Sequence, residues 1–109
     1  MDFESDCKLY IDTDLGKDWL FGRIYAYIGG IRSGMHDTSA SWCNLSVKSN
    51  SSSSCNWKYC TELEIVNNVS RECYINNIIK LINYLKSFCA RVSASCDFEE
   101  LLNSNIYYS

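Results

Sequence analysis

Among the residue types that commonly carry chemistry, cysteine is the compositional oddity of this chain, with seven among 109 residues. The count is odd and no C-x-x-C pair occurs. The closest pairs, Cys55/Cys60 and Cys89/Cys96, lack the usual spacing of structural zinc ligands. Because no secretory signal is apparent, we expect reduced thiols that pack as small apolar side chains, without a metal site.

Histidine and carboxylate residues also lack an arrangement typical of catalysis. His36 is the only histidine, and it has no recognisable partner motif for a cysteine nucleophile. Glu62 and Glu64, or Asp12 and Asp14, could act as paired carboxylates. Alternate glutamates on a strand are ordinary solvated positions, however, and Asp14 is placed to cap a helix. The sequence therefore predicts neither an enzyme nor a bound cofactor.

Composition predicts a single domain covering residues 1–109. Apolar residues make up 47% of the chain and charged residues 21%, which excludes disordered and fibrous classes. Ten Lys+Arg against thirteen Asp+Glu give a net charge of −3, whereas a binder of nucleic-acid phosphates is expected to be basic. No run of residues is long and apolar enough for a membrane span, and the acidic start lacks the order of a signal peptide. We expect a cytoplasmic protein without nucleic-acid or membrane partners.

The first elements available to position a site are a strand over residues 8–12 and a helix over residues 15–28. Asp14 is a suitable cap for this helix, and Gly29-Gly30 supplies its stop. Residues 31–40 carry few apolar side chains and are expected to form a loop. The expected apolar stripe of the helix comprises Trp19, Leu20, Ile24, Tyr27 and Ile28.

A β-hairpin is expected next, from strands over residues 42–48 and 57–66. The second strand has the clearest alternation of the chain. A polar Ser/Asn connector over residues 49–54 separates the two strands, which favours an antiparallel pair. The apolar faces are expected to hold Cys43, Leu45 and Val47 in the first strand, and Trp57, Tyr59, Thr61, Leu63 and Ile65 in the second.

The last expected elements are a helix over residues 71–88 and a strand over residues 91–96. Ser70 is a good N-cap for the helix. Asp97 and Glu100 match a capping box for a closing helical turn over residues 98–102. The stripe of the second helix is expected to comprise Ile75, Ile78, Ile79, Ile82, Leu85 and Cys89.

The order β-α-β-β-α-β predicts an α+β fold. Because each helix has one apolar stripe and each strand one apolar face, we expect the ferredoxin-like split βαββαβ arrangement, a four-stranded antiparallel sheet with two helices on one face. Right-handed crossovers then place strands 8–12 and 57–66 in the centre. The bare sheet face is expected to present Lys8, Tyr10, Asp12, Asn44, Ser46, Lys48, Lys58, Cys60, Glu62, Glu64, Arg91, Ser93 and Ser95.

RNA-recognition domains of this topology stack bases on aromatic residues of the bare face. Tyr10 is suitable for this role, but the neighbouring strand offers Glu62 and Glu64, which repel phosphates. The glycine-containing segment 29–34 follows a helix, whereas a phosphate cradle precedes one. The sequence therefore disfavours RNA binding.

Protein binding is the function class that remains. Aromatic residues, 14% of the chain, are enriched at interface centres, and the candidates are Trp42, Trp57, Tyr107 and Tyr108. Acidic residues gather near strand ends, where several are accounted for as helix caps. Glu62 and Glu64 cap no helix and are the better candidates for facing a basic partner. The expected partner-binding residues are Tyr10, Asp12, Asp14, Glu62, Glu64, Asp97 and Glu99.

Three segments together resemble a known group of proteins: KLYIDTDL at 8–15, Trp42-Cys43 at the start of the expected second strand, and ASCDFEEL at 94–101. The combination is similar to small bacterial immunity proteins of contact-dependent growth inhibition and related polymorphic toxin systems. The additional cysteines and the serine run at 51–54 depart from that pattern. The resemblance implies a cytoplasmic protein that binds the C-terminal domain of one cognate toxin, often a nuclease, and occludes its active site.

A second interpretation stays open on the fold alone. Domains of this topology commonly pair their sheets edge to edge, so the chain could instead be a small-molecule or subunit-interaction module that forms a homodimer. A mass that depends on concentration would favour this interpretation, whereas a gene for a large secreted protein directly upstream would favour an immunity protein.

Overall fold

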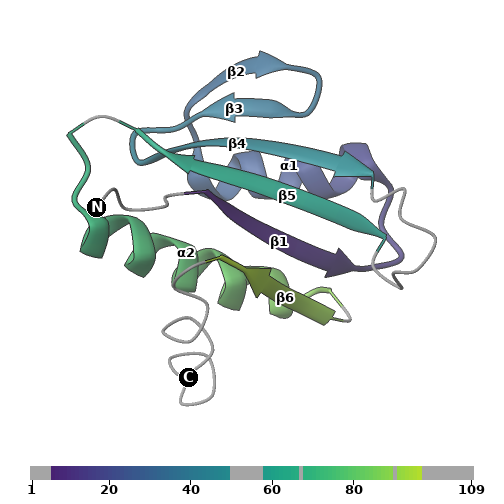
Figure 1. Ribbon diagram of the computed structural model, residues 1–109. Helices are drawn as coiled ribbons and strands as arrows, with labels where there is room; N and C mark the ends of the chain where they lie inside the picture. The colour runs from purple at the N-terminus through teal and green to yellow at the C-terminus, as the bar shows by residue number, and fades with distance from the viewer. Residues whose placement is uncertain (1–5, 50–57, 67, 90, 97–109) are drawn as a thin grey trace.

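The computed structural model describes residues 6–49, 58–66, 68–89 and 91–96, which form one six-stranded antiparallel sheet and two helices (Figure 1). The sheet order is β2-β3-β4-β5-β1-β6. Both helices lie on the same face of the sheet (Figure 1). In chain order the elements are β1 (Cys7–Asp12), α1 (Lys17–Ile28), β2 (Ile31–Gly34), β3 (Asp37–Ser39), β4 (Cys43–Ser49), β5 (Tyr59–Ile65), α2 (Arg71–Lys86) and β6 (Arg91–Ser95).

The predicted α+β class is confirmed, but the prediction of a four-stranded sheet is wrong. The segment 31–40, expected to be a loop, forms the hairpin β2–β3 and extends the sheet beyond β4 (Figure 1). Thr38 is the buried residue of this hairpin, and its hydroxyl donates to the carbonyls of Gly29 and Ile31 at 3.2 and 3.3 Å. An edge hairpin that buries so little needs no apolar alternation, and backbone pairing to β4 holds it instead.

Strand alternation divides the sheet into a buried and an open face. Cys7, Leu9 and Ile11 of β1 are buried, whereas Lys8, between Cys7 and Leu9, is exposed. The same pattern holds in β4, where Cys43, Leu45 and Val47 are buried. Successive side chains of a strand point to opposite faces, so one face of every long strand joins the core beneath the helices. The predicted buried and open faces of the three strands β1, β4 and β5 are confirmed where the structure describes them, except that Cys60, expected to be presented on the open face, is buried.

Helix α1 departs from the sequence prediction at its start and along its apolar stripe. It begins at Lys17 with Gly16 as N-cap, so Asp14 does not cap it. Its buried residues are Leu20, Phe21 and Ile24. Trp19 and Tyr27, expected in the stripe, are 71% and 45% exposed. The buried arc therefore includes Phe21, a residue that the predicted stripe omitted.

Helix α2 agrees with its prediction more closely. The backbone N–H of Cys73 donates to the Ser70 hydroxyl at 3.1 Å, which confirms Ser70 as the N-cap. The helix ends at Lys86, two residues before the expected end, and the turn after it closes with a bond from Cys89 N–H to the Leu85 carbonyl at 2.8 Å. Its buried residues are Tyr74, Ile75, Ile78, Leu81, Ile82 and Leu85.

The chain passes from α1 into the hairpin through a turn that requires glycine. Gly30 has φ +100°, and a Cβ at this position would lie 2.5 Å from the Ser39 carbonyl oxygen. Gly22, in the middle of α1, has open space around the corresponding position. An alanine methyl group would therefore clash with the backbone at position 30, whereas it would fit without contact at position 22.

We expect Gly30→Ala to lower the free energy of unfolding by about 2 kcal/mol or more, because alanine at positive φ is strained and its methyl group clashes with β3. Gly22→Ala is the matched control and should raise that free energy by about 0.5–1 kcal/mol, because it removes a glycine from a helix interior. Urea unfolding followed by circular dichroism measures both. Equal effects of the two variants would contradict the assigned role of Gly30.

Burial of ionisable thiol and phenol groups in the core predicts that the folded state loses stability at alkaline pH. Burial raises the pKa of the Cys43 thiol from 9.0 to about 12. Desolvation also raises the pKa of Tyr74 and of Cys89. Between pH 9 and 12 the unfolded chain therefore loses a proton that the folded Cys43 keeps, and stability falls as pH rises through this window.

The contribution of Cys43 to this loss is about 1.4 kcal/mol per pH unit. We expect Cys43→Ala to flatten the decline in unfolding free energy above about pH 9.5, even though the variant is less stable at neutral pH. Urea unfolding at a series of fixed pH values gives the slope. Cys73→Ala, which removes an exposed thiol, should leave the slope unchanged, and a Cys43→Ala slope equal to that of the wild type would contradict the prediction.

Candidate functional site

An acidic groove of about 340 Å³ lies on the open face of the sheet. We use the term acidic groove for this hollow over the ends of β1, β3, β4 and β5. Four carboxylates line it, and Lys8 is the one basic residue of its described lining. The polar lining residues are Asp6, Asp37, Glu62, Glu64, Lys8, Ser33, Thr38, Ser39, Asn44 and Ser46.

Strand register places these side chains beside one another. Asp37 is paired with Ser46, and Ser46 with Glu62. Glu62 is in turn paired with Lys8 of β1. Partners across an antiparallel sheet have Cα atoms about 4.5–5.5 Å apart, so these four residues form one row across four strands. The neighbouring row holds Ser39, Asn44 and Glu64.

Hydrogen bonds and one ion pair fix part of this row. The Ser46 hydroxyl donates to the Asp37 carboxylate. Lys48, two residues beyond Ser46 on β4, contacts Glu62 with 3.3 Å between Nζ and Oε1. Both partners are substantially exposed, so this ion pair contributes less than about 1 kcal/mol to stability.

The groove holds more negative than positive charge. Glu62 has Lys8 opposite and Lys48 at ion-pair distance. Within the described part of the chain, no cationic group lies at ion-pair distance from Glu64 or Asp37. The groove can therefore accept a cationic group from outside, such as a lysine or arginine side chain, and it disfavours phosphate.

The structure places the predicted partner-binding residues in two separate regions. Glu62 and Glu64 lie in the acidic groove. Tyr10 and Asp12 share the open face but follow Lys8 along β1, away from the groove. Asp12 is four residues beyond Lys8, roughly 13 Å along the strand, and it pairs with Arg91 at 3.2 Å between Oδ2 and Nε.

Asp14 lies apart from the groove, in the exposed turn between β1 and α1. It lines a different hollow together with Ser87 and Cys89 at the end of α2. Asp14 and the two glutamates therefore lie in separate regions, because β1 carries Asp14 away from the end where Glu62 and Glu64 lie. The predicted residues Asp97 and Glu99 lie outside the described residues, as does the capping box of Asp97 and Glu100.

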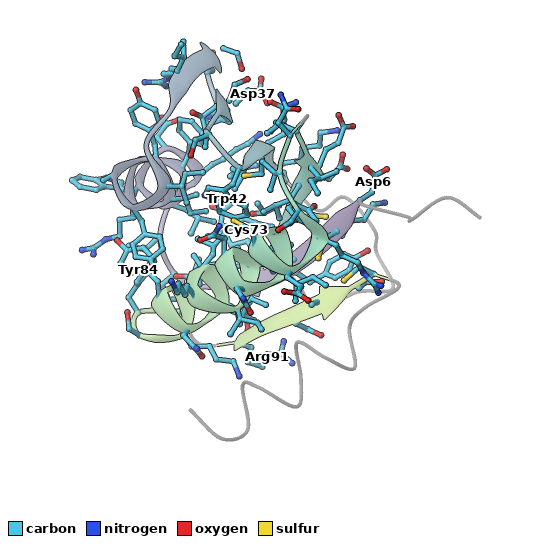
Figure 2. All side chains as sticks on the ribbon, turned by 90° about the vertical axis from the view of Figure 1, so that its left-hand side faces the viewer. Asp6, Asp37, Trp42, Cys73, Tyr84 and Arg91 are labelled. Carbon is cyan, nitrogen blue, oxygen red and sulfur yellow. The ribbon has the colours of Figure 1, made fainter. Side chains whose placement is uncertain are left out.

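Two carboxylates of the groove, Asp37 and Asp6, were not among the residues predicted from the sequence. Asp37 belongs to β3, which was expected to be loop, and it reaches the groove only because β3 pairs with β4. Asp6 directly precedes β1 and lines the groove at the start of that strand (Figure 2). Asp37-Thr38-Ser39 has no apolar alternation, since its one buried residue is a threonine, and three residues are too few for a reliable strand prediction.

The exposed aromatic residues also differ from those predicted. Trp42, expected at an interface, is buried and packs against Tyr74 with 6.1 Å between ring centroids, so that expectation is wrong (Figure 2). Trp57, Tyr107 and Tyr108 lie outside the described residues. The exposed aromatic surface is instead on the helices, where Trp19 borders a hollow lined also by Asp18, Gly22, Arg23, Ala26 and Tyr84.

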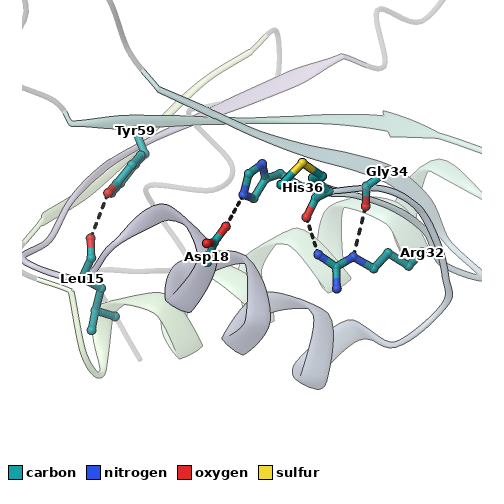
Figure 3. A network of polar contacts seen from close by, with 7 residues as sticks. Leu15, Asp18, Arg32, Gly34, His36 and Tyr59 are labelled. Carbon is teal, nitrogen blue, oxygen red and sulfur yellow. Dashed lines mark hydrogen bonds and ion pairs between the residues drawn. The ribbon is translucent and has the colours of Figure 1, made fainter.

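His36 has a structural role that positions the wall of the groove. Its Nε2 lies 2.6 Å from Asp18 Oδ1, and this contact connects the β2–β3 turn to the start of α1 (Figure 3). The Val47 N–H donates to the His36 carbonyl at 2.9 Å. Arg32 donates within the same turn to the carbonyls of Gly34 and Met35 at 3.1 and 2.6 Å (Figure 3). The hairpin that carries Asp37 is thus held from both sides.

A second polar contact holds the opposite end of the sheet. The Tyr59 hydroxyl donates to the Leu15 carbonyl at 2.9 Å and joins β5 to the turn before α1 (Figure 3).

Among the described residues, no group of three or more histidine, cysteine, aspartate or glutamate side chains is arranged to hold a metal ion. The described face presents fixed carboxylates, whose chemistry suits electrostatic recognition of a cationic group.

Comparisons with known proteins leave this site to be interpreted from its own geometry. No protein-family model matches the chain, and neither a curated protein nor a solved structure matches it. Neither of the two helices in the described part of the chain has the length and apolar character required to cross a bilayer.

The charge distribution predicts opposite stability effects for two open-face carboxylates. Glu64→Gln should raise the free energy of unfolding by about 0.3 kcal/mol at low ionic strength, because it removes like-charge repulsion in the groove. Asp12→Asn should lower it by about 0.5 kcal/mol, because it removes the ion pair with Arg91. Urea unfolding in 10 mM and 0.5 M salt (about 30 and 4 Å of screening length) measures both effects, and both should shrink in the higher salt. A Glu64→Gln variant with a lower free energy of unfolding would contradict the surplus of negative charge in the groove.

Proposed function

We propose that this protein is an immunity protein that binds the C-terminal domain of a cognate toxin, in the cytoplasm, and blocks the toxin's active site. The acidic groove carries this proposal. Hydrogen bonds hold its hairpin side in place, it has surplus negative charge, and it lies on a face of the sheet that the helices leave uncovered. The proposed partner is a basic nuclease domain. The proposal also treats β1, β4, β5 and β6, with the two helices, as a ferredoxin-like core to which the β2–β3 hairpin has been added.

Electrostatics makes an acidic groove suitable for this task. A nuclease active site is basic because it holds phosphates, and fixed carboxylates can occupy the same site in their place. Complementary charge also raises the rate of encounter, which matters when the toxin is already active on arrival. The net charge of −3 is modest, so the recognition is local and depends on the groove carboxylates.

A fixed groove adds affinity for a further reason. Binding costs conformational entropy whenever side chains or loops must be ordered, and a surface already held in place avoids part of that cost. The Ser46–Asp37 hydrogen bond and the contact of His36 with Asp18 hold the hairpin side of the groove. The central contact in the proposed complex is a toxin lysine or arginine side chain placed between Asp37 and Glu64.

The decisive comparison reverses charge in the groove and on a helix. We expect Glu62→Lys/Glu64→Lys to weaken binding at least tenfold, about 1.4 kcal/mol, whereas Lys80→Glu on α2 should change it less than twofold. The binding partner for titration calorimetry is the C-terminal domain of a large secreted protein, where the gene immediately upstream encodes one. Equal affinities of the two variants would remove the groove from the proposed interface.

Net charge is controlled by a matched pair of single variants. Glu64→Lys in the groove and Glu72→Lys at the start of α2 each replace a negative charge with a positive one and bring the formal charge from −3 to −1. Both glutamates are exposed. Only Glu64→Lys should weaken binding and fail to protect cells that express the toxin domain. Failure of the wild-type chain to bind that domain would overturn the function itself.

One observation favours the alternative of a self-associating interaction module. Ile31 and Met35 of the edge hairpin are 77% and 73% exposed, and an exposed edge strand can pair with a second copy. Sedimentation equilibrium separates the two functions. A monomeric mass over the micromolar range supports the immunity protein, whereas a dimer that Ile31→Lys dissociates supports the module.

A further inference from the structure

Two cysteines from opposite ends of the described chain lie against each other at the edge of the sheet. Cys7 opens β1, and Cys96 directly follows β6, 89 residues later. Their Sγ atoms are 3.1 Å apart. We propose that Cys7 and Cys96 form a redox-active pair, in which oxidation by a low-molecular-weight disulfide such as oxidised glutathione creates an intramolecular disulfide between β1 and β6.

The sheet register brings the two backbones to the right separation. Lys8 and Ser95 are Cα partners in the antiparallel pairing of β1 with β6, and the next residues outward are Cys7 on β1 and Cys96 directly after β6. Antiparallel partners have Cα atoms about 4.5–5.5 Å apart, within the usual 4.4–6.8 Å of a disulfide. The two sulfur atoms therefore need to approach by only about 1 Å to reach the 2.05 Å of a bond.

Exposure gives the two thiols different roles. Cys7 is 1% exposed, whereas Cys96 is half-buried and open to a small oxidant. Cys43 and Cys89 are buried, and the exposed Cys73 lies on α2 with its sulfur accepting from the Asn77 amide at 3.3 Å. Within the described residues, the Cys7–Cys96 pair thus combines a nearby second sulfur with access from solvent.

The proposed chemistry is a two-step thiol–disulfide exchange. The Cys96 thiolate attacks one sulfur of oxidised glutathione, which forms a mixed disulfide and releases one glutathione thiolate. The Cys7 thiol then loses its proton to solvent and attacks the Cys96 sulfur, which releases the second glutathione. Two cysteine thiols are oxidised to one disulfide, and one glutathione disulfide is reduced to two thiols.

The disulfide would restrain the side of the sheet where β1 borders the groove and β6 forms the edge. Cys7 and Lys8 both line the acidic groove, and β6 is the outermost strand beside them. A bond from Cys7 to Cys96 fixes β6 to β1 and closes a long loop, which stabilises the folded chain chiefly by restricting the unfolded one. This inference does not depend on the proposed function, since it requires only the two thiols and an oxidant.

The test uses the full chain in glutathione buffers of increasing oxidised-to-reduced ratio. Acid quenching, alkylation of remaining thiols and peptide mass mapping should identify a Cys7–Cys96 link, with a loss of two hydrogens from the intact mass. The link should form at a lower ratio than glutathione adds to the exposed Cys73. The thermal midpoint of the oxidised chain should rise by roughly 10 °C.

Single variants separate this pair from the other cysteines. Cys96→Ser should abolish the link and the rise in the thermal midpoint, whereas Cys73→Ser should preserve both. Because Cys7 is buried, Cys7→Ala is checked for folding by circular dichroism, and Cys96→Ser carries the conclusion if it does not fold. Glutathione on Cys73 before any Cys7–Cys96 link, or an equal rise in the midpoint of Cys96→Ser, would overturn the proposal.

Discussion

The alternation of side chains along β1 is the constraint on which the rest of the structure depends. Leu9 and Ile11 are fully buried beneath the helices, and β5 and β6 pair with the two edges of the same strand. A shift of one residue in either pairing would turn every apolar side chain of the strand towards water. The register that buries the core is therefore the same register that places Lys8 opposite Glu62 on the open face.

The hairpin β2–β3 converts one end of that open face into a groove. It adds almost no apolar burial, and its position depends on backbone pairing to β4, on the Thr38 hydroxyl and on the contact of His36 with Asp18. These are directional polar contacts, each of modest net stability. The core thus fixes the sheet, whereas a small set of hydrogen bonds fixes the wall that carries Asp37.

Sequence periodicity predicted the parts of the fold that bury apolar surface. The faces of β4 and β5 and the cap of α2 at Ser70 follow from alternation and capping, and Glu62 and Glu64 were placed on the open face for the same reason. The hairpin was missed because an edge strand that buries only Thr38 has no such pattern. Asp37 was missed with it, and the prediction that Asp14 caps the first helix is wrong, because α1 begins at Lys17 with Gly16 as its N-cap.

The groove carboxylates can remain unneutralised because they face water. In bulk water two charges 4 Å apart interact by only about 1 kcal/mol, so a surplus of negative charge on an open sheet face costs the fold little. The same charges interact several times more strongly once a partner excludes water from them. A cation that entered between Asp37 and Glu64 would meet carboxylates already held in position, whereas a phosphate would meet strengthened repulsion. An open acidic face is therefore nearly neutral for stability and strongly selective for the charge of what covers it.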